Sequence, residues 1–339
     1  MNPPKCDDLD YIHFLIAAQK VFTCTEAARC QPHAGTEQAP AHDAFTRLLQ
    51  RQPPDTEALW QEAEAFVETK EGLLVLDDTT LDKPYAKKMD LVTHHWSGKH
   101  KSVVKGINLL TLLWRERTTC SAEAAHIPVD LRLYDKPFGG KSKNKHFRNM
   151  LSVAKERGFS PEYVVFDSWY SSLENLKTVR SHSWAFFTRL KKNRLVNPDD
   201  SHNRQVCEVA IPEEGREVHL KGFGFVRVFR TAGRDGSADY WATNDLSMSE
   251  AEREHLADLA WGIETYHRQA KQYCGIERSQ CRSERAQRNH ILFSLRAYLR
   301  LEVHRLREAV SFYESKLSII REAVRRYLAD PAYILNPTA

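Results

Sequence analysis

The sequence lacks any apolar run that approaches the length of a membrane span. A transmembrane helix needs about 20 consecutive apolar residues, and the longest runs here are far shorter. The N-terminal segment, MNPPKCDDLDYIHF, also lacks a basic region followed by an apolar stretch, so we expect no export signal. We therefore expect a soluble, cytoplasmic protein with no membrane partner.

Closely spaced cysteine pairs are also absent. The seven cysteines form an odd, scattered set without a C-x-x-C pair, which argues against a secreted disulfide scaffold and for reduced thiols. Cys274 and Cys281, seven residues apart on a predicted helix, could share a metal, but buried structural thiols are the favoured interpretation. The sequence contains neither the G-x-S-x-G motif of α/β hydrolases nor the H-E-x-x-H motif of zinc proteases.

Glycine and proline are too few for a fibrous chain, with 14 of each among 339 residues. The 42% of hydrophobic residues is too high for a disordered chain. At roughly 150 residues per domain, this length predicts about two compact units or one large domain with an insertion. No internal repeat is visible in the sequence.

Charge is unevenly distributed along the chain. Residues 1–70 carry six Lys or Arg against eleven Asp or Glu, whereas the whole chain has a net charge of +4. The remaining residues are therefore clearly basic. A basic region of this extent favours a polyanionic partner, although an ordinary solvated surface would also account for it.

The hydrophobic period changes along the chain and suggests five segments. Helical spacing dominates the first segment, short continuous apolar runs such as GLLVLDD and YVVFD predict buried strands in the second, and alternating Gly-rich stretches predict a β-rich insertion. We expect a helical N-terminal domain at 1–69, an α/β core with a mixed sheet at 70–194 and 247–310, the insertion at 195–246, and a helical C-terminal tail at 311–339.

Acidic residues follow two of the predicted buried strands. Asp77 and Asp78 end the first strand and Asp167 ends another. An unpaired carboxylate in the core would cost several kcal/mol, and strand ends are where α/β sheets place their sites. These acids therefore favour a metal site. Since side chains alternate along a strand, only one of Asp77 and Asp78 can face it; strand continuity favours Asp77 and leaves Asp78 as the alternative.

A predicted helix, WGIETYHRQAK, carries a polar stripe. Glu264, His267, Arg268 and Lys271 fall at i, i+3, i+4 and i+7, which is one helix face. The periodicity is equally consistent with a solvated stripe and with a site in which the Glu binds metal and the basic groups bind phosphates.

A Gly-Gly-Lys-Ser stretch at 139–142 resembles the end of a phosphate-binding loop. The Gly that such a loop requires five residues before Gly140 is Asp135, so nucleotide binding is not expected. The stretch opens a basic loop with Lys141, Lys143 and Lys145, which could contact DNA phosphates or simply begin a solvated helix.

Three motifs, LVLDDTT, VVFDSWY and WGIETYHRQAK, resemble the acidic motifs of the DDE transposases of bacterial insertion sequences. The group that the chain resembles has an RNase H-like core with a β-rich insertion before the final Glu. The resemblance covers roughly residues 70–275 and includes DDTTLDKP, a Lys-rich hairpin, GINLLTLL and TNDLSMSEAE, in the same order.

This resemblance implies metal-dependent strand cleavage and strand transfer in cut-and-paste DNA transposition. By resemblance, Asp77 (or Asp78), Asp167 and Glu264 would hold two Mg²⁺ ions, for which Mn²⁺ may substitute. Lys271, Arg268 and His267 would grip the DNA backbone. The implied partners are double-stranded transposon ends and target DNA, bound by a homodimer in the cytoplasm, on the nucleoid.

The sequence departs from the family pattern before the Glu. Family members usually carry a Tyr and an Arg seven and four residues before it, where this chain has Ala257 and Ala260. Two alternatives therefore stay open at the sequence level: a catalytically impaired DNA-binding derivative of a transposase, and a metal-dependent nuclease on the same core.

Overall fold

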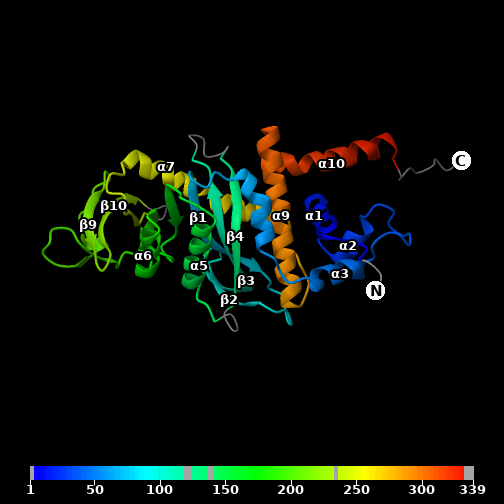
Figure 1. The fold of residues 1–339 in the computed structure, drawn as a ribbon, viewed down its shortest axis with the longest axis horizontal. Coiled ribbons are helices and arrows are strands. Elements are labelled where there is room, and N and C mark those ends of the chain that lie inside the picture. Colours follow the sequence, from blue (N-terminus) through cyan, green and yellow to red (C-terminus); the bar gives the residue numbers. More distant parts are fainter. Residues whose placement is uncertain (1–3, 99, 118–123, 136–139, 233–235, 332–339) are drawn as a thin grey trace. The chain divides into compact units, whose positions relative to one another are not determined.

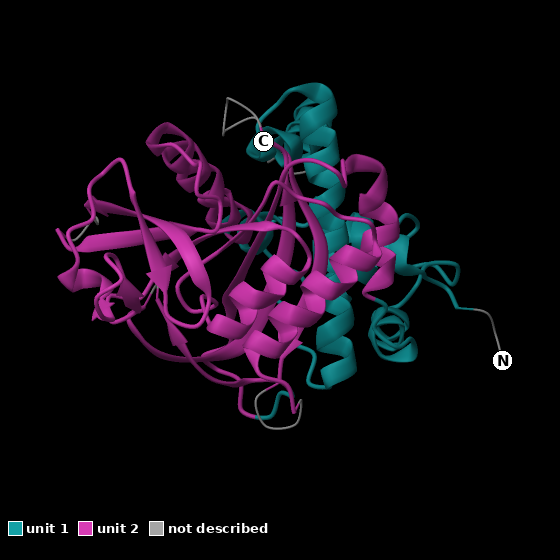
Figure 2. Cartoon of the chain, turned by 60° about the vertical axis from the view of Figure 1, so that its left-hand side comes forward, with its two compact units in different colours: residues 1–55, 88–90, 268–339 teal, residues 56–87, 91–267 magenta. Residues whose placement is uncertain are grey.

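The computed structural model describes residues 4–98, 100–117, 124–135, 140–232 and 236–331 (Figure 1). The chain divides into two compact units, shown in different colours in Figure 2. A helical unit comprises residues 1–55, 88–90 and 268–339, and a sheet unit comprises 56–87 and 91–267.

The helical unit joins the two ends of the chain. It contains α1 (Asp8–Ala17), α2 (Cys24–Arg29), α3 (His42–Arg51), α9 (Glu284–Glu308) and α10 (Phe312–Ala329). The Tyr11 hydroxyl on α1 lies 3.0 Å from Nδ1 of His290 on α9, and Asn289 Nδ2 donates to the Leu49 carbonyl at 2.9 Å. The expected helical N-terminal and C-terminal regions are thus confirmed, and α9 is the helix on which they meet.

The core of the sheet unit is a mixed sheet. Its first strands are β1 (Leu73–Asp82), β2 (Thr93–Ser97), β3 (Ser102–Arg115), β4 (His126–Tyr134), β5 (Tyr163–Phe166) and β6 (Ala185–Leu190). The long β3 pairs antiparallel with β1 along one edge and with β2 and then β4 along the other, while β1, β5 and β6 are parallel neighbours. This order is the one expected for an RNase H-like core.

The β-rich insertion extends the same sheet. It contributes β7 (Leu195–Asn197), β8 (Arg204–Gln205), β9 (Arg216–Leu220), β10 (Gly224–Ala232) and β11 (Ala238–Thr243), with a short 3-10 helix, η2 (Val206–Glu208). Strand β11 pairs antiparallel with β6, so the sheet continues from the core into the insertion.

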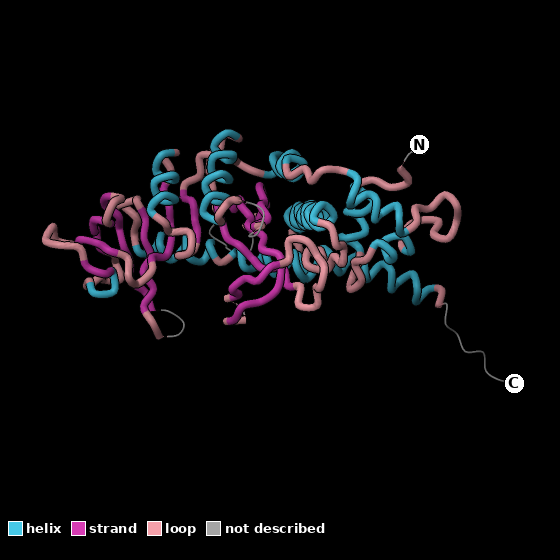
Figure 3. The backbone as a smooth tube through the Cα atoms, turned by 90° about the horizontal axis from the view of Figure 1, so that it is seen from below, coloured by secondary structure: helices cyan, strands magenta, loops and turns pink. Residues whose placement is uncertain are grey.

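Helices cover both faces of this sheet. The unit contains α4 (Glu57–Ala63), η1 (Glu64–Phe66), α5 (Lys143–Glu156), α6 (Leu173–Ser181), α7 (Glu250–Ala260) and the first half of α8 (Gly262–Tyr273). Figures 1 and 3 show α5 and α6 on one face and α7 on the other. Coverage on both faces explains why β1 and β5 begin as continuous apolar runs.

The structure corrects two sequence-based expectations and adds one strand. Strand β1 does not end at Asp77 and Asp78 but continues to Asp82, paired with β3 throughout. Strand β4 was not predicted, although its alternation of Ile127, Val129, Leu131 and Leu133 has the period of a strand. Cys274 and Cys281 do not share a helix, because α8 ends at Tyr273.

The six cysteines in the described part of the chain are free thiols, whereas Cys120, like Gly139 of the Gly-Gly-Lys-Ser stretch, lies outside the described residues. No helix within the described residues is long and apolar enough to cross a membrane.

Candidate active site

The register of β1 places Asp77 and Asp78 on opposite faces of the sheet. Directly paired residues of antiparallel strands share a face. Thr80 pairs with Asn108, so Asn108 shares the face of Asp78, and Leu73 pairs with Arg115, so Arg115 shares the face of Asp77. The contacts of Asn108 and Arg115 therefore show which helix covers each face of β1.

Asp78 lies on the α5 face and is held by three donors. Its Oδ2 accepts from Asn108 Nδ2 at 2.6 Å and from Lys143 Nζ at 2.7 Å, and its Oδ1 accepts from the Tyr170 hydroxyl at 2.5 Å. Burial alone would raise the pKa of Asp78, but the charge of Lys143 and these hydrogen bonds outweigh it and lower that pKa. The Asp78 carboxylate is therefore ionised and compensated by the protein itself.

The face of Asp77 is covered by the start of α8. Gly262 packs so closely on Arg115 that a Cβ atom there would overlap the guanidinium and lie 2.5 Å from Nε2 of His126. Only a residue without a side chain permits this approach. The contact brings α8, and with it Glu264, to the face on which Asp77 lies.

Asp167 directly follows β5. The last residue of that strand, Phe166, pairs in parallel with Leu76 and packs on Phe147 of α5, with ring centroids 5.0 Å apart. The Asp167 carboxylate accepts from the backbone N–H of Trp169 at 2.9 Å. Burial, and then the charge of Asp78, raise the pKa of Asp167 despite this hydrogen bond.

Asp77 lies among negatively charged neighbours. Burial raises the pKa of Asp77 well above its usual value, and the negative charges of Asp78, Asp167 and Glu264 raise it further. Glu264 is exposed on α8. Negative charge thus surrounds Asp77, whereas the charge of Arg189 partly offsets the rise in the pKa of Asp167.

This donor set suits a hard divalent cation in its chemistry. Mg²⁺ prefers carboxylate oxygens and keeps positions open for water and phosphate, and a cation would offset the repulsion that raises the pKa of Asp77. No three Asp, Glu, His or Cys side chains of the described residues are gathered closely enough to form a ready metal site. The residues thus fit the ion by type.

The predicted basic residues differ in their surroundings. Lys141 and Lys145 are exposed at the start of α5, and Arg268 is exposed on α8, where Lys271 Nζ lies 3.8 Å from a Glu277 carboxylate oxygen. By contrast, Lys143 is engaged by Asp78, and His267 is buried with 6% of its surface exposed. Lys141, Lys145 and Arg268 are thus accessible to a polyanion, Lys271 is paired and only 19% exposed, and Lys143 and His267 are part of the packed structure.

Sequence reasoning did not identify Asn108 and Tyr170 as residues of the site. Asn108 interrupts the apolar run Ile107–Trp114, and a polar residue in a buried strand needs a hydrogen-bond partner. The need of Asn108 for a hydrogen-bond partner could have identified it from the sequence as a residue near the site. Tyr170 stands three residues after Asp167, but nothing local shows that its hydroxyl reaches Asp78.

A mixed sheet of this order, with acidic residues on two adjacent strands and helices on both faces, is the fold expected for an RNase H-like core. The sequence matches the family described as transposase DDE domain over residues 68–300, and the chain belongs to this family. It is accordingly a DNA transposase, an enzyme that cleaves and transfers DNA strands.

One solved structure shows a similar fold. The chain is similar to the piggyBac transposase in a synaptic complex with hairpin DNA, at 10% identity and a TM-score of 0.51, over 98% of this chain and 74% of that one. The Mos1 strand transfer complex also matches, at 11% identity and a TM-score of 0.20, over 55% of this chain and 58% of that one. No curated protein matches the sequence.

Proposed function

We propose that this transposase acts by a cut-and-paste mechanism that depends on divalent metal, with Asp77, Asp167 and Glu264 as the metal ligands. The observation that supports the proposal is electrostatic: the negative charges of Asp167 and Glu264 add to that of Asp78 in raising the pKa of Asp77. The three carboxylates would hold two Mg²⁺ ions, for which Mn²⁺ can substitute.

Asp77, rather than Asp78, is the proposed ligand of the first acidic motif. The lone pairs of Asp78 are taken up by Asn108, Lys143 and Tyr170 on the opposite face. The charge of Glu264 instead contributes to the raised pKa of Asp77. A ligand must have oxygens available to the ion, which favours the residue whose negative charge the protein leaves uncompensated.

The bound ions would supply Lewis-acid stabilisation for in-line displacement at a DNA phosphorus. The chain itself positions the ligands. Asp78 and its three donors fix β1 to α5 and to the loop after β5, and Gly262 sets the depth at which α8 lies on the sheet. We propose that Lys141, Lys145, Arg268 and Lys271 bind phosphates, because a compact ammonium or a forked guanidinium pairs well with phosphate oxygens.

The proposed partners are the double-stranded ends of the transposon and a target duplex. We propose that two copies of the chain act together on these DNAs, since two transposon ends must be cut and joined in one event. Because the substrate is chromosomal DNA, the proposed place of action is the nucleoid in the cytoplasm.

The test is a cleavage and strand-transfer assay on the DNA ends that flank the gene, with and without Mg²⁺. Asp77→Asn, Asp167→Asn and Glu264→Gln should each abolish cleavage but bind the DNA nearly as well as the wild type, because backbone contacts dominate affinity. Cleavage at the wild-type rate in any of these variants would remove that residue from the ligand set. Cleavage without joining would indicate a nuclease instead.

A further inference from the structure

Two cysteines that are far apart in the sequence meet within the helical unit. Cys24 is the first residue of α2, and Cys281 lies in the segment between α8 and α9. The thiol of Cys24 is in hydrogen-bond contact with the thiol of Cys281. Both are thiols and not a disulfide. Two adjacent thiols can be oxidised to a disulfide within one chain, which a single thiol cannot.

The packing beside the two cysteines holds their segments together. The turn after α8 lies so close to Phe22 that a Cβ atom at Gly275 would overlap its ring. Gly275 has a φ of 63°, a conformation that residues with a side chain rarely adopt. Its carbonyl also lies 2.9 Å from Nε2 of His290 on α9. The segment that leads to Cys281 is therefore fixed against the one that leads to Cys24.

The backbone of Cys281 is held while its sulfur remains within reach of solvent. Its N–H donates to the Ser279 hydroxyl at 3.3 Å, and its carbonyl accepts from the Gln287 amide of α9. Cys281 and Cys24 are each partly exposed, whereas Cys274 is buried. A small thiol reagent can therefore reach this pair of sulfur atoms.

The hydrogen bond gives the two sulfur atoms different roles. It raises the pKa of the Cys24 thiol, and burial raises that pKa further, so Cys24 keeps its proton and donates it. A thiol that donates to a neighbouring sulfur stabilises the thiolate of that neighbour. Cys281 is therefore the sulfur that ionises first and reacts first.

We propose that Cys24 and Cys281 form a reversible redox modification site, at which a low-molecular-weight disulfide such as oxidised glutathione joins them by an intramolecular disulfide bond. The Cys281 thiolate attacks one sulfur of oxidised glutathione, breaks its S–S bond and releases one glutathione thiolate. Cys24 then loses its proton, attacks the Cys281 sulfur of the mixed disulfide and releases the second glutathione. Two protein thiols are oxidised, one glutathione disulfide is reduced to two thiols, and the two protons pass to these products.

The bond would act on the stability of the helical unit. It joins positions 24 and 281 and so closes a loop that contains most of the chain. A cross-link of this kind restricts the unfolded chain far more than the folded one. Oxidation should therefore stabilise the contact between α2 and the segment that follows α8. The inference depends neither on the proposed metal ligands nor on DNA.

The experiment incubates the full chain with oxidised glutathione, blocks the remaining thiols by alkylation and identifies disulfide-linked peptides by mass spectrometry. The wild type should yield a peptide pair that joins Cys24 to Cys281, and dithiothreitol should remove it. The melting temperature should rise by several degrees on oxidation and return on reduction. Cys24→Ser should show neither the pair nor the rise, and should retain one glutathione on Cys281, because no second thiol displaces it.

Cys30→Ser is the matched control. Cys30 follows the same helix and is exposed, and its thiol is directed to Glu26. This variant should form the pair between Cys24 and Cys281 as the wild type does. The inference is overturned if Cys24 and Cys281 are recovered as thiols or as separate glutathione adducts while Cys30 of the wild type has reacted. An equal rise in melting temperature in Cys24→Ser would contradict it as well. Because the assay contains neither DNA nor metal, its result is separate from that of the cleavage assay.

Discussion

The ammonium of Lys143 lies 2.7 Å from Asp78 Oδ2, on the face of β1 opposite Asp77. Two adjacent carboxylates of one strand therefore have opposite surroundings. Asp78 is neutralised within the protein, which lowers its pKa, whereas Asp77 is surrounded by negative charge, which raises its pKa. This difference decides how each residue should respond to substitution.

Asp77→Asn should abolish strand cleavage and leave the fold intact, because it removes a carboxylate that the protein leaves uncompensated. Asp78→Asn should instead lower the free energy of unfolding by about 1–3 kcal/mol, since it leaves Lys143 half-buried without its anion. Cleavage by the pure proteins and chemical denaturation of the same samples measure the two effects. Asp82→Asn, farther along β1, is the control. Equal loss of cleavage in both variants, with circular dichroism unchanged, would contradict the assignment of Asp77 alone.

Gly262→Ala should displace the start of α8 and reduce cleavage strongly. The added methyl group would overlap the guanidinium of Arg115, which is fully buried and has no space into which to move. Overpacking of this kind costs about 1–3 kcal/mol. Gly98→Ala is the matched control, because a Cβ atom at Gly98 meets nothing within 4 Å. Wild-type melting temperature and cleavage in Gly262→Ala would show that the packing of α8 does not position Glu264.

Lys271→Ala should make DNA binding less sensitive to salt. One phosphate contact releases roughly one counterion, so the slope of log affinity against log salt should fall by about one unit. The measurement is a salt titration of duplex binding, with Lys20→Ala, an exposed lysine of the same unit, as the control. An unchanged slope would mean that Lys271 serves only its ion pair with Glu277.

Because Lys316 loses its proton more easily in the folded chain, the free energy of unfolding should be higher at alkaline pH than at neutral pH. Burial lowers the pKa of this ammonium from 10.5 to about 8, at a site where Nζ donates to the Leu15 carbonyl and to the Tyr273 carbonyl. Between these two pH values the unfolded chain holds a proton that the folded chain has released. The free energy of unfolding should therefore rise as the pH increases from about 8 to 10.5, by up to about 3 kcal/mol in total.

The comparison for that prediction is Lys316→Met, which keeps the length of the side chain but cannot titrate. Denaturation at several pH values should show the rise in the wild type and not in the variant. Parallel curves for the two proteins would mean that Lys316 is charged in the folded state throughout this range.

Much of the core was predictable from local patterns. The apolar runs before Asp77 and Asp167 identified β1 and β5, because a strand buried on both faces needs continuous apolar side chains. Helical spacing placed Glu264 and Lys271 on one helix, now α8. The change of period after residue 194 marked the insertion. Each of these depends on residues within a few positions of one another, which is the range over which hydrophobic periodicity acts.

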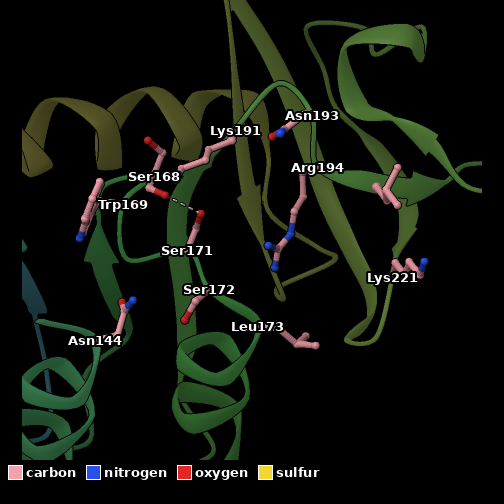
Figure 4. Close-up of a pocket in the computed structure, with 11 residues that line it drawn as sticks. Asn144, Ser168, Trp169, Ser171, Ser172, Leu173, Lys191, Asn193, Arg194 and Lys221 are labelled. Atoms are coloured by element: carbon pink, nitrogen blue, oxygen red, sulfur yellow. Dashed lines mark hydrogen bonds between the residues drawn. The ribbon is translucent and has the colours of Figure 1, made fainter. Parts of the chain in front are cut away.

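Other features depend on which strands and helices meet. Alternation along β1 already required Asp77 and Asp78 to face opposite sides, but only the pairing with β3 and the contact of Gly262 with Arg115 decided that α8 covers the side of Asp77. In the sequence, Lys143 is one of three basic residues of a predicted loop. In the folded chain it forms an ion pair with Asp78, which only tertiary packing decides. A pocket lined by residues from Asn144 to Lys221 likewise forms from segments that lie far apart in the chain (Figure 4). The sequence by itself determined which elements form and which residues carry charge; their partners were decided by tertiary contacts, because pairing between distant segments leaves no periodic trace in the chain.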